Sequence, residues 1–93
     1  MAALAEKTER YERLLAEACA AAETAVPPET PLGEAAREFQ GMAEAYLEDG
    51  RHFLEEDDRV NALAAFAYGH AWLDAGARVG LFSVPTDDDL FTV

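Results

Sequence analysis

The fold is decided by residues 50–80, which read GRHFLEEDDRVNALAAFAYGHAWLDAGARVG. This stretch predicts the end of one helix, a tight acidic turn and a second helix that is nearly free of charge. Asp58, or Asp57 one residue earlier, is suited to the N-cap because its side chain can accept a hydrogen bond from a first-turn amide. From Val60 to Leu73 the apolar residues lie on more than one helix face, which predicts burial on more than one side. Gly80 is expected to end this helix.

Two more helices are expected on the N-terminal side of this stretch, over about residues 2–24 and 31–55. In the first of these helices, residues at helical spacing form one apolar face: Leu4, Tyr11, Leu15, Ala18 and Ala22. Pro27 and Pro28 prevent its continuation because they hold the chain extended and remove amide donors. Thr30 followed by Pro31 is typical of an N-cap and a first helical residue, so the second helix is expected to begin there.

These elements predict an all-α fold, an antiparallel three-helix bundle with a short C-terminal tail. Short connections force neighbouring helices to run in opposite directions. The expected organisation is a single domain over residues 1–93, with helices at about 2–24, 31–55 and 58–81 and a tail at 83–93. Gly50 inside the second helix costs about 1 kcal/mol relative to Ala, so we expect a neighbouring helix to approach closely there.

The tail combines an acidic triplet, Asp87–Asp89, with the apolar end Leu90-Phe91-Thr92-Val93. The triplet is expected to be solvated, since it lacks the ligand spacing of a calcium loop. Apolar residues at a terminus usually fray. The alternative is that this end docks on the bundle and covers Trp72 or Val79.

The chain is strongly acidic, with 7 basic and 19 acidic residues and a formal net charge of −12. Lys7 is its only lysine, and the acidic residues are spread along the chain rather than held in one segment. This pattern favours a cytoplasmic protein adapted to molar salt, where the Debye length is about 3 Å and carboxylates repel each other weakly. The charge and the dispersed arginines argue against binding to nucleic acid or to an anionic membrane.

Other broad classes are disfavoured by what the sequence lacks. The longest uncharged run is too short to span a bilayer, and acidic residues near the N-terminus interrupt any signal-peptide core. Cys19 is the only cysteine, so no disulfide can form within the chain. It lies among alanines and is expected to be a small buried side chain rather than a catalytic thiol. No metal-binding or nucleotide-binding motif is present, so we expect neither a metal nor another cofactor.

The hairpin formed by the second and third expected helices resembles a single tetratricopeptide unit. The resemblance rests on Tyr46, Gly50, Phe53, Ala62 and Phe66, which match the aromatic, glycine and alanine positions of that repeat. Only one unit is present and its closing proline is missing, whereas arrays need about three repeats for stability. The resemblance therefore indicates shared hairpin packing and not a repeat protein.

The chain is also similar to a family of short archaeal proteins known as domain of unknown function 357. Three segments carry this similarity: YLED at 46–49, HFLE at 52–55 and AFAYGHAWLDAG at 65–76. The family implies a compact three-helix bundle in an archaeal cytoplasm and implies no activity. With the acidic composition, it implies a halophilic member.

Two sets of residues on the third expected helix are candidates for a site. His70 and Asp74 share a helix face at i and i+4, a pairing that suits a general base or an oriented ligand but equally a core histidine satisfied by Asp74 or by a backbone carbonyl. A metal site needs at least three convergent ligands, and none is evident around this pair. Tyr68, Trp72 and Val79 form an aromatic and apolar patch that marks a partner surface, unless the tail or the first helix covers it.

The sequence therefore supports two functions from different classes. The first is a non-enzymatic protein-interaction or structural module, whose partner is an unidentified protein or a second copy of the chain. The second is a small enzyme or ligand-binding protein that uses His70 and Asp74. The sequence favours the first because it contains no catalytic motif, and it leaves the question of enzymatic activity open.

Overall fold

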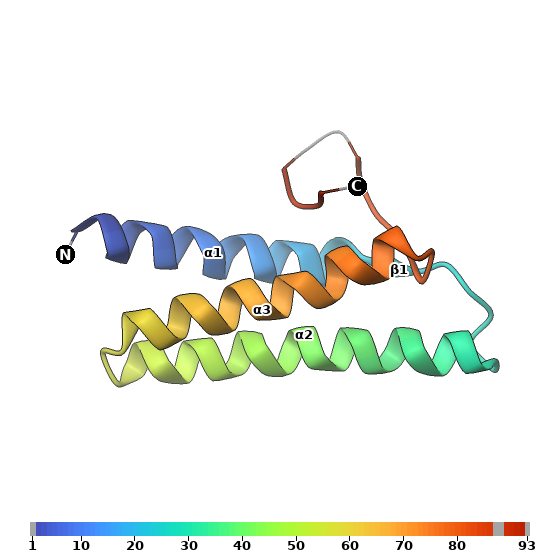
Figure 1. The fold of residues 1–93 in the computed structure, drawn as a ribbon, viewed down its shortest axis with the longest axis horizontal. Coiled ribbons are helices and arrows are strands. Elements are labelled where there is room, and N and C mark those ends of the chain that lie inside the picture. Colours follow the sequence, from blue (N-terminus) through green and yellow to red (C-terminus); the bar gives the residue numbers. More distant parts are fainter. Residues whose placement is uncertain (1, 87–88, 93) are drawn as a thin grey trace.

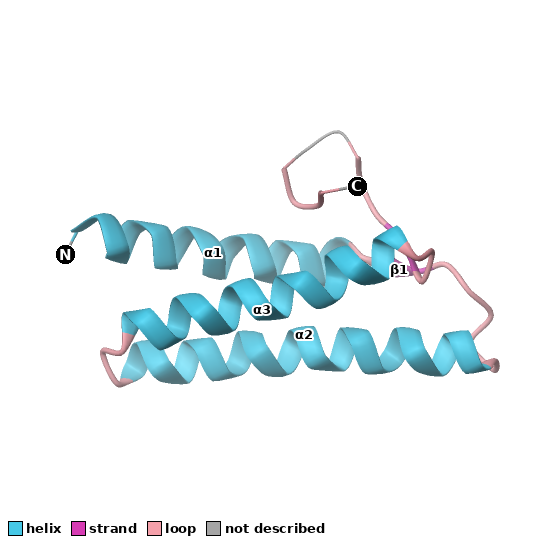
Figure 2. Ribbon diagram, in the orientation of Figure 1, coloured by secondary structure: helices cyan, strands magenta, loops and turns pink. Residues whose placement is uncertain are grey.

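The computed structural model describes residues 2–86 and 89–92, and three long helices dominate it (Figures 1 and 2). The helices are α1 (Ala2–Ala21), α2 (Pro31–Glu55) and α3 (Arg59–Arg78). Successive helices run in opposite directions, and α3 lies between α1 and α2 and contacts both (Figure 1). The Cα trace measures 45 × 26 × 16 Å. The predicted all-α bundle is confirmed.

Side-chain caps fix the starts of α2 and α3 at the predicted residues. The Thr30 hydroxyl accepts a hydrogen bond from the Gly33 amide at 3.1 Å, and Pro31 is the first residue of α2. A carboxylate oxygen of Asp58 accepts from the Asn61 amide at 3.2 Å at the start of α3. Each cap satisfies one of the amides that have no partner within the first turn of the helix.

The first helix ends earlier than the sequence predicted. α1 stops at Ala21, and the next residues form a short strand, β1 (Glu23–Thr24), which pairs antiparallel with β2 (Phe82–Ser83). The predicted end at residue 24 is wrong because the approach to Pro27 must be extended. The extended backbone then bonds to the chain that leaves α3, where the Ala25 amide donates to the Leu81 carbonyl at 2.8 Å.

The third helix also ends earlier than predicted, at Arg78 rather than residue 81. Gly80 adopts φ +88°, and the Leu81 amide donates back to the Gly76 carbonyl at 2.8 Å. This is the Schellman arrangement, in which a glycine in the left-handed region reverses the chain and satisfies the last carbonyls. The reversal sends β2 back toward β1 and directs the tail over the bundle.

The core lies where α3 meets the other two helices. Its largest fully buried side chains are Phe66, Leu15, Leu73 and Thr8, and the Thr8 hydroxyl donates to the Leu4 carbonyl at 2.7 Å. The close approach expected at Gly50 is present, because a Cβ at that position would lie 2.2 Å from Cε1 of Phe66. The ring of Phe66 therefore occupies the space that any other residue at position 50 would need.

Candidate functional site

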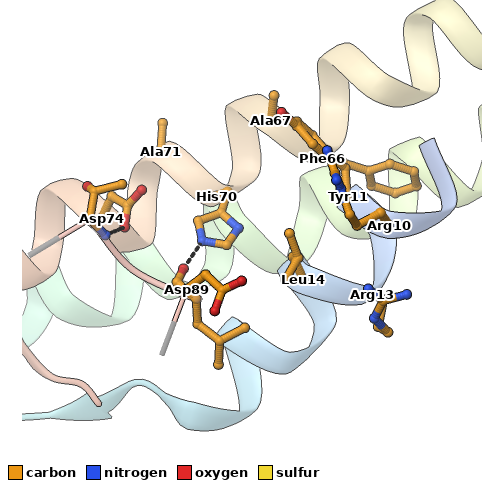
Figure 3. Close-up of a pocket in the computed structure, with 12 residues that line it drawn as sticks. Arg10, Tyr11, Arg13, Leu14, Phe66, Ala67, His70, Ala71, Asp74 and Asp89 are labelled. Carbon is orange, nitrogen blue, oxygen red and sulfur yellow. Dashed lines mark hydrogen bonds between the residues drawn. The ribbon is translucent and has the colours of Figure 1, made fainter. Parts of the chain in front are cut away.

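The C-terminal tail docks on α3 through the two polar residues that the sequence singled out. The ring Nε2 of His70 is hydrogen-bonded to the main-chain carbonyl of Leu90. A carboxylate oxygen of Asp74 accepts from the amide of Thr92 at 3.1 Å. His70 and Asp74 thus converge on the tail backbone (Figure 3), and the hydrogen bond of each leads to the tail.

Two further residues complete this docking. Arg78 donates from Nη2 to the carbonyl of Thr92 at 2.6 Å, one helical turn beyond Asp74. Phe91 lies between the two bonded tail residues and is only 6% exposed, and its ring centroid is 6.1 Å from that of His70. The tail therefore contributes a buried aromatic side chain to the core.

The docked tail closes one end of a cleft between α1 and α3. The cleft has a volume of about 420 Å³. The α1 side carries Arg10, Tyr11, Arg13 and Leu14, and the α3 side carries Phe66, Ala67, His70, Ala71 and Asp74 (Figure 3). Asp89, Leu90 and Thr92 of the tail line the remaining edge. The cleft therefore combines two arginines and two carboxylates with an apolar lining.

The two cations that line the cleft, Arg10 and Arg13, both lie on α1, and Lys7 lies near Arg10 outside the lining. The Lys7 ammonium and the Arg10 guanidinium lie 5.8 Å and 5.7 Å from the centroid of the Tyr11 ring. Arg13 forms an exposed i,i+4 ion pair with Glu17 at 3.6 Å. An exposed pair of this kind contributes little to stability, so Arg13 can rearrange at small cost. This side is therefore locally basic in a chain whose net charge is −12.

The predicted interaction patch lies on the other flank of α3 and is only partly accessible. Tyr68 is 52% exposed and Val79 is 71% exposed, so the tail does not cover Val79. Trp72 is half-buried, and its ring meets Phe39 of α2 edge-to-face at a centroid distance of 5.0 Å. The packing partner of Trp72 is thus on α2, whereas the sequence offered only the tail or the first helix as cover for this patch.

Aromatic contacts continue along the line where α2 packs against α3, which we call the α2–α3 seam. Tyr68 meets Tyr46 edge-to-face at 4.6 Å and Trp72 at 6.3 Å. The indole Nε1 of Trp72 is buried and, within the described part of the chain, has no hydrogen-bond acceptor. Leaving such a donor unpaired costs about 1–3 kcal/mol, which the ring packing must offset.

Cys19 lies where α1 faces α2, away from the cleft. The thiol is half-buried, and burial, with a smaller contribution from the Glu44 carboxylate, raises its pKa from 9.0 to about 11, against the lowering effect of Arg51. A thiol with a raised pKa is a poor nucleophile near neutral pH. Within residues 2–86 and 89–92, no three His, Cys, Asp or Glu side chains are grouped to hold a metal ion.

Sequence reasoning found His70 and Asp74 but missed the residues that act with them. Arg78 follows Asp74 by four residues, so the i, i+4, i+8 series was a visible signal for a polar stripe on α3. The contribution of Arg10 and Arg13 depends on how α1 is rotated against α3, which helical spacing alone does not give. The rest of the acidic triplet, Asp87 and Asp88, and the terminal Val93 lie outside the described residues.

Comparisons with known proteins identify a family but no characterised relative. A family model described as "Protein of unknown function (DUF357)" matches residues 10–82. No curated protein and no solved structure matches the chain. The matched span includes all of α2 and α3 and most of α1, whereas the docked tail lies beyond it.

Proposed function

The chain belongs to the family described as "Protein of unknown function (DUF357)", and we propose that it acts as a protein-interaction module without catalytic activity of its own. One observation carries this proposal: in a chain of net charge −12, α3 and its C-cap expose the apolar side chains Val60, Tyr68 and Val79 at 67%, 52% and 71%. Contiguous exposed apolar patches mark partner sites, and exposed alanines between these three residues make the surface continuous.

The exposed side of α3 is also suited to close approach by another helix. Between the three large residues it presents exposed alanines, at 64, 67, 71 and 75. Small side chains let two helix backbones come together, and the spacing of three or four residues keeps the line on one helix side. None of the helices in the described residues is both long enough and apolar enough to cross a membrane, so this line is not part of a spanning helix.

The partner that fits this surface best is a second copy of the chain. The exposed residues are arranged symmetrically about the peptide bond between Gly69 and His70: Val60 with Val79, Ala64 with Ala75, and Tyr68 with Ala71. A two-fold interface requires that residue i meets j while j meets i, and an antiparallel pair of α3 helices does this. It also places the large Tyr68 of each copy against the small Ala71 of the other.

Self-association is expected to depend on salt, because two copies that each carry a charge of −12 repel one another at low ionic strength. In molar KCl, light scattering coupled to size exclusion should give twice the chain mass of 10.1 kDa. Tyr68→Glu should return the protein to a monomer.

Leu32→Glu is the matched control, since Leu32 is 57% exposed but lies on α2. This variant should remain dimeric in the same buffer. A chain that stays monomeric at high concentration in molar KCl would contradict the proposal, as would equal disruption by Leu32→Glu.

A ligand-binding function at His70 and Asp74 is the second candidate, and the cleft beside them favours it. The volume of about 420 Å³ is large enough for a small molecule, and Arg10 and Arg13 would attract an anion. Both polar residues are already bonded to the tail, so a ligand or substrate that uses them has to displace Leu90 and Thr92. For this reason catalysis by the pair is the weaker proposal.

We also propose that the protein is an archaeal cytoplasmic protein adapted to high salt. This is supported by 19 acidic against 7 basic residues, with a single lysine, and by ion pairs among the described residues that are largely exposed. Screening of carboxylate repulsion should make the melting temperature rise steeply from low to molar KCl. A melting temperature that does not change over this range would contradict the proposal.

A further inference from the structure

We propose that the cleft between α1 and α3 is a binding site for an extended peptide segment of a partner protein, with an acidic residue followed by an apolar and an aromatic residue. Within the chain, Asp89, Leu90 and Thr92 of the tail line this cleft, and Phe91 between the last two is buried. The proposal does not depend on the one for self-association, although the two surfaces share Ala67 and Ala71 of α3.

The first argument is geometric. His70, Asp74 and Arg78 follow one another at intervals of four residues, which is a rise of about 6 Å along a helix. Alternate residues of an extended chain are about 6.6 Å apart, and their polar groups point the same way. The two spacings nearly match, so His70 and Asp74 can bond to alternate residues of the tail, Leu90 through its carbonyl and Thr92 through its amide. Arg78 adds a second bond to Thr92, through its carbonyl.

The second argument is that these contacts are made to main-chain atoms. A stripe that bonds to backbone carbonyls and amides accepts many sequences, as in other modes of strand recognition, and side-chain pockets supply the specificity. Here the pocket is the one that holds Phe91, which is 6% exposed. A ligand therefore needs a large apolar, preferably aromatic, residue between the two positions that bond to α3.

The third argument is charge. Arg10 and Arg13 line the α1 side of the cleft, and Asp89, the residue before Leu90, lines the same cleft. A carboxylate at this ligand position is attracted by the basic side, and salt should weaken the attraction. This gives the order acidic, apolar, aromatic for the recognised segment.

The fourth argument is that the tail does not fill the cleft. With residues 89–92 in place, a space of about 420 Å³ remains, and Ala67 and Ala71 on its α3 side are exposed. A longer partner segment could therefore contact Tyr11 and Leu14 of α1 as well. The tail is tethered, so its effective concentration at the site is of the order of millimolar, and a partner must compete with it.

The test uses the full chain and a fluorescein-labelled synthetic peptide with the sequence of residues 84–93, VPTDDDLFTV. Fluorescence anisotropy should show weak binding to the wild-type protein, whose own tail competes. Thr92→Pro in the protein removes the amide that donates to Asp74 at an exposed position, so the fold should be retained. This variant should bind the peptide at least tenfold more tightly than wild type.

Further variants separate a peptide site from a merely structural tail. Adding Asp74→Ala to Thr92→Pro should remove the gain in affinity, and a peptide with Phe91→Ala should not bind. Val79→Ser, on the surface proposed for self-association, should leave peptide binding unchanged. Circular dichroism in the same buffer shows whether each variant is folded.

Two results would overturn the proposal. One is a folded Thr92→Pro variant that binds the peptide no better than wild type. The other is equal binding of a scrambled peptide, which would show non-specific adhesion. Phe91→Ala in the protein is a second variant that weakens docking of the tail, and it should give the same gain in affinity for the peptide. The test therefore does not depend on one substitution.

Discussion

The two flanks of α3 are packed by different chemistry, although they belong to the same helix. The flank that faces α2 is apolar: the Phe66 ring lies over Gly50, and Trp72 meets Phe39. The flank that faces α1 and the tail carries His70, Asp74 and Arg78, which bond to main-chain atoms. Close apolar packing of the first kind resists substitution, whereas hydrogen bonds to a short segment can be exchanged for those of another segment.

The comparison suggests a division of roles. The α2–α3 seam is expected to carry most of the free energy of folding, because it buries large apolar side chains. The tail beside the α1–α3 cleft is expected to detach locally without unfolding of the bundle, because one buried side chain and a few hydrogen bonds hold it. Substitutions on the α2 flank should therefore lower the free energy of unfolding of the whole bundle. Substitutions on the tail flank should have smaller effects that are confined to docking of the tail.

The largest effect is expected for Phe66→Ala. Phe66 is fully buried, and removing a buried phenylalanine ring costs about 3–5 kcal/mol of unfolding free energy through lost transfer energy and the resulting cavity. Denaturant unfolding at a fixed KCl concentration measures this loss. Leu32→Ala, at an exposed position on α2, should change stability by no more than about 0.5 kcal/mol. Similar losses for the two variants would show that the seam is not the main source of stability.

Two glycines of α2 allow a sharper test of the same seam. Gly50→Ala places a Cβ 2.2 Å from an atom of the buried Phe66 ring, and such overpacking costs about 1–3 kcal/mol, more than the helix propensity that alanine gains. At Gly41 nothing lies within 4 Å of the added Cβ. Gly41→Ala should therefore stabilise the protein by about 1 kcal/mol or somewhat less. The opposite signs should appear in parallel thermal or denaturant unfolding curves, and stabilisation by both would mean that Phe66 moves aside freely.

A smaller effect is expected on the tail flank. Phe91→Ala removes a ring that is 6% exposed, but the loss is limited to the docking energy of the tail, about 1–2 kcal/mol, because the tail can detach while the bundle stays folded. Hydrogen exchange should show loss of protection at the Thr92 amide with little change in α2. A loss as large as that of Phe66→Ala would mean that the tail does not detach independently of the bundle, and would remove the distinction between the flanks.

Much of this arrangement could be predicted from the sequence. The parts that could not be predicted have one physical cause in common. The Thr30 and Asp58 caps and the close approach at Gly50 depend on local chemistry and helical spacing, which a sequence displays directly. The β1–β2 pairing and the docking of Leu90 and Thr92 join segments far apart in the chain. Which distant segment satisfies a backbone group depends on how the helices are rotated, and helical periodicity does not determine that rotation.

The smallest expected effect is the pH dependence that comes from Cys19, at the interface between α1 and α2. Burial raises the pKa of its thiol to about 11, so the folded state disfavours the thiolate. The thiol form therefore contributes stability that is complete below about pH 9 and is lost as the pH rises through about 11. The rate of alkylation by iodoacetamide should rise toward pH 11 in the folded protein but level off near pH 9 in denaturant. Glu44→Gln should shift the folded profile to lower pH because it removes a carboxylate that opposes ionisation. A folded profile with its midpoint near pH 9 would mean that α1 does not shield this thiol against α2.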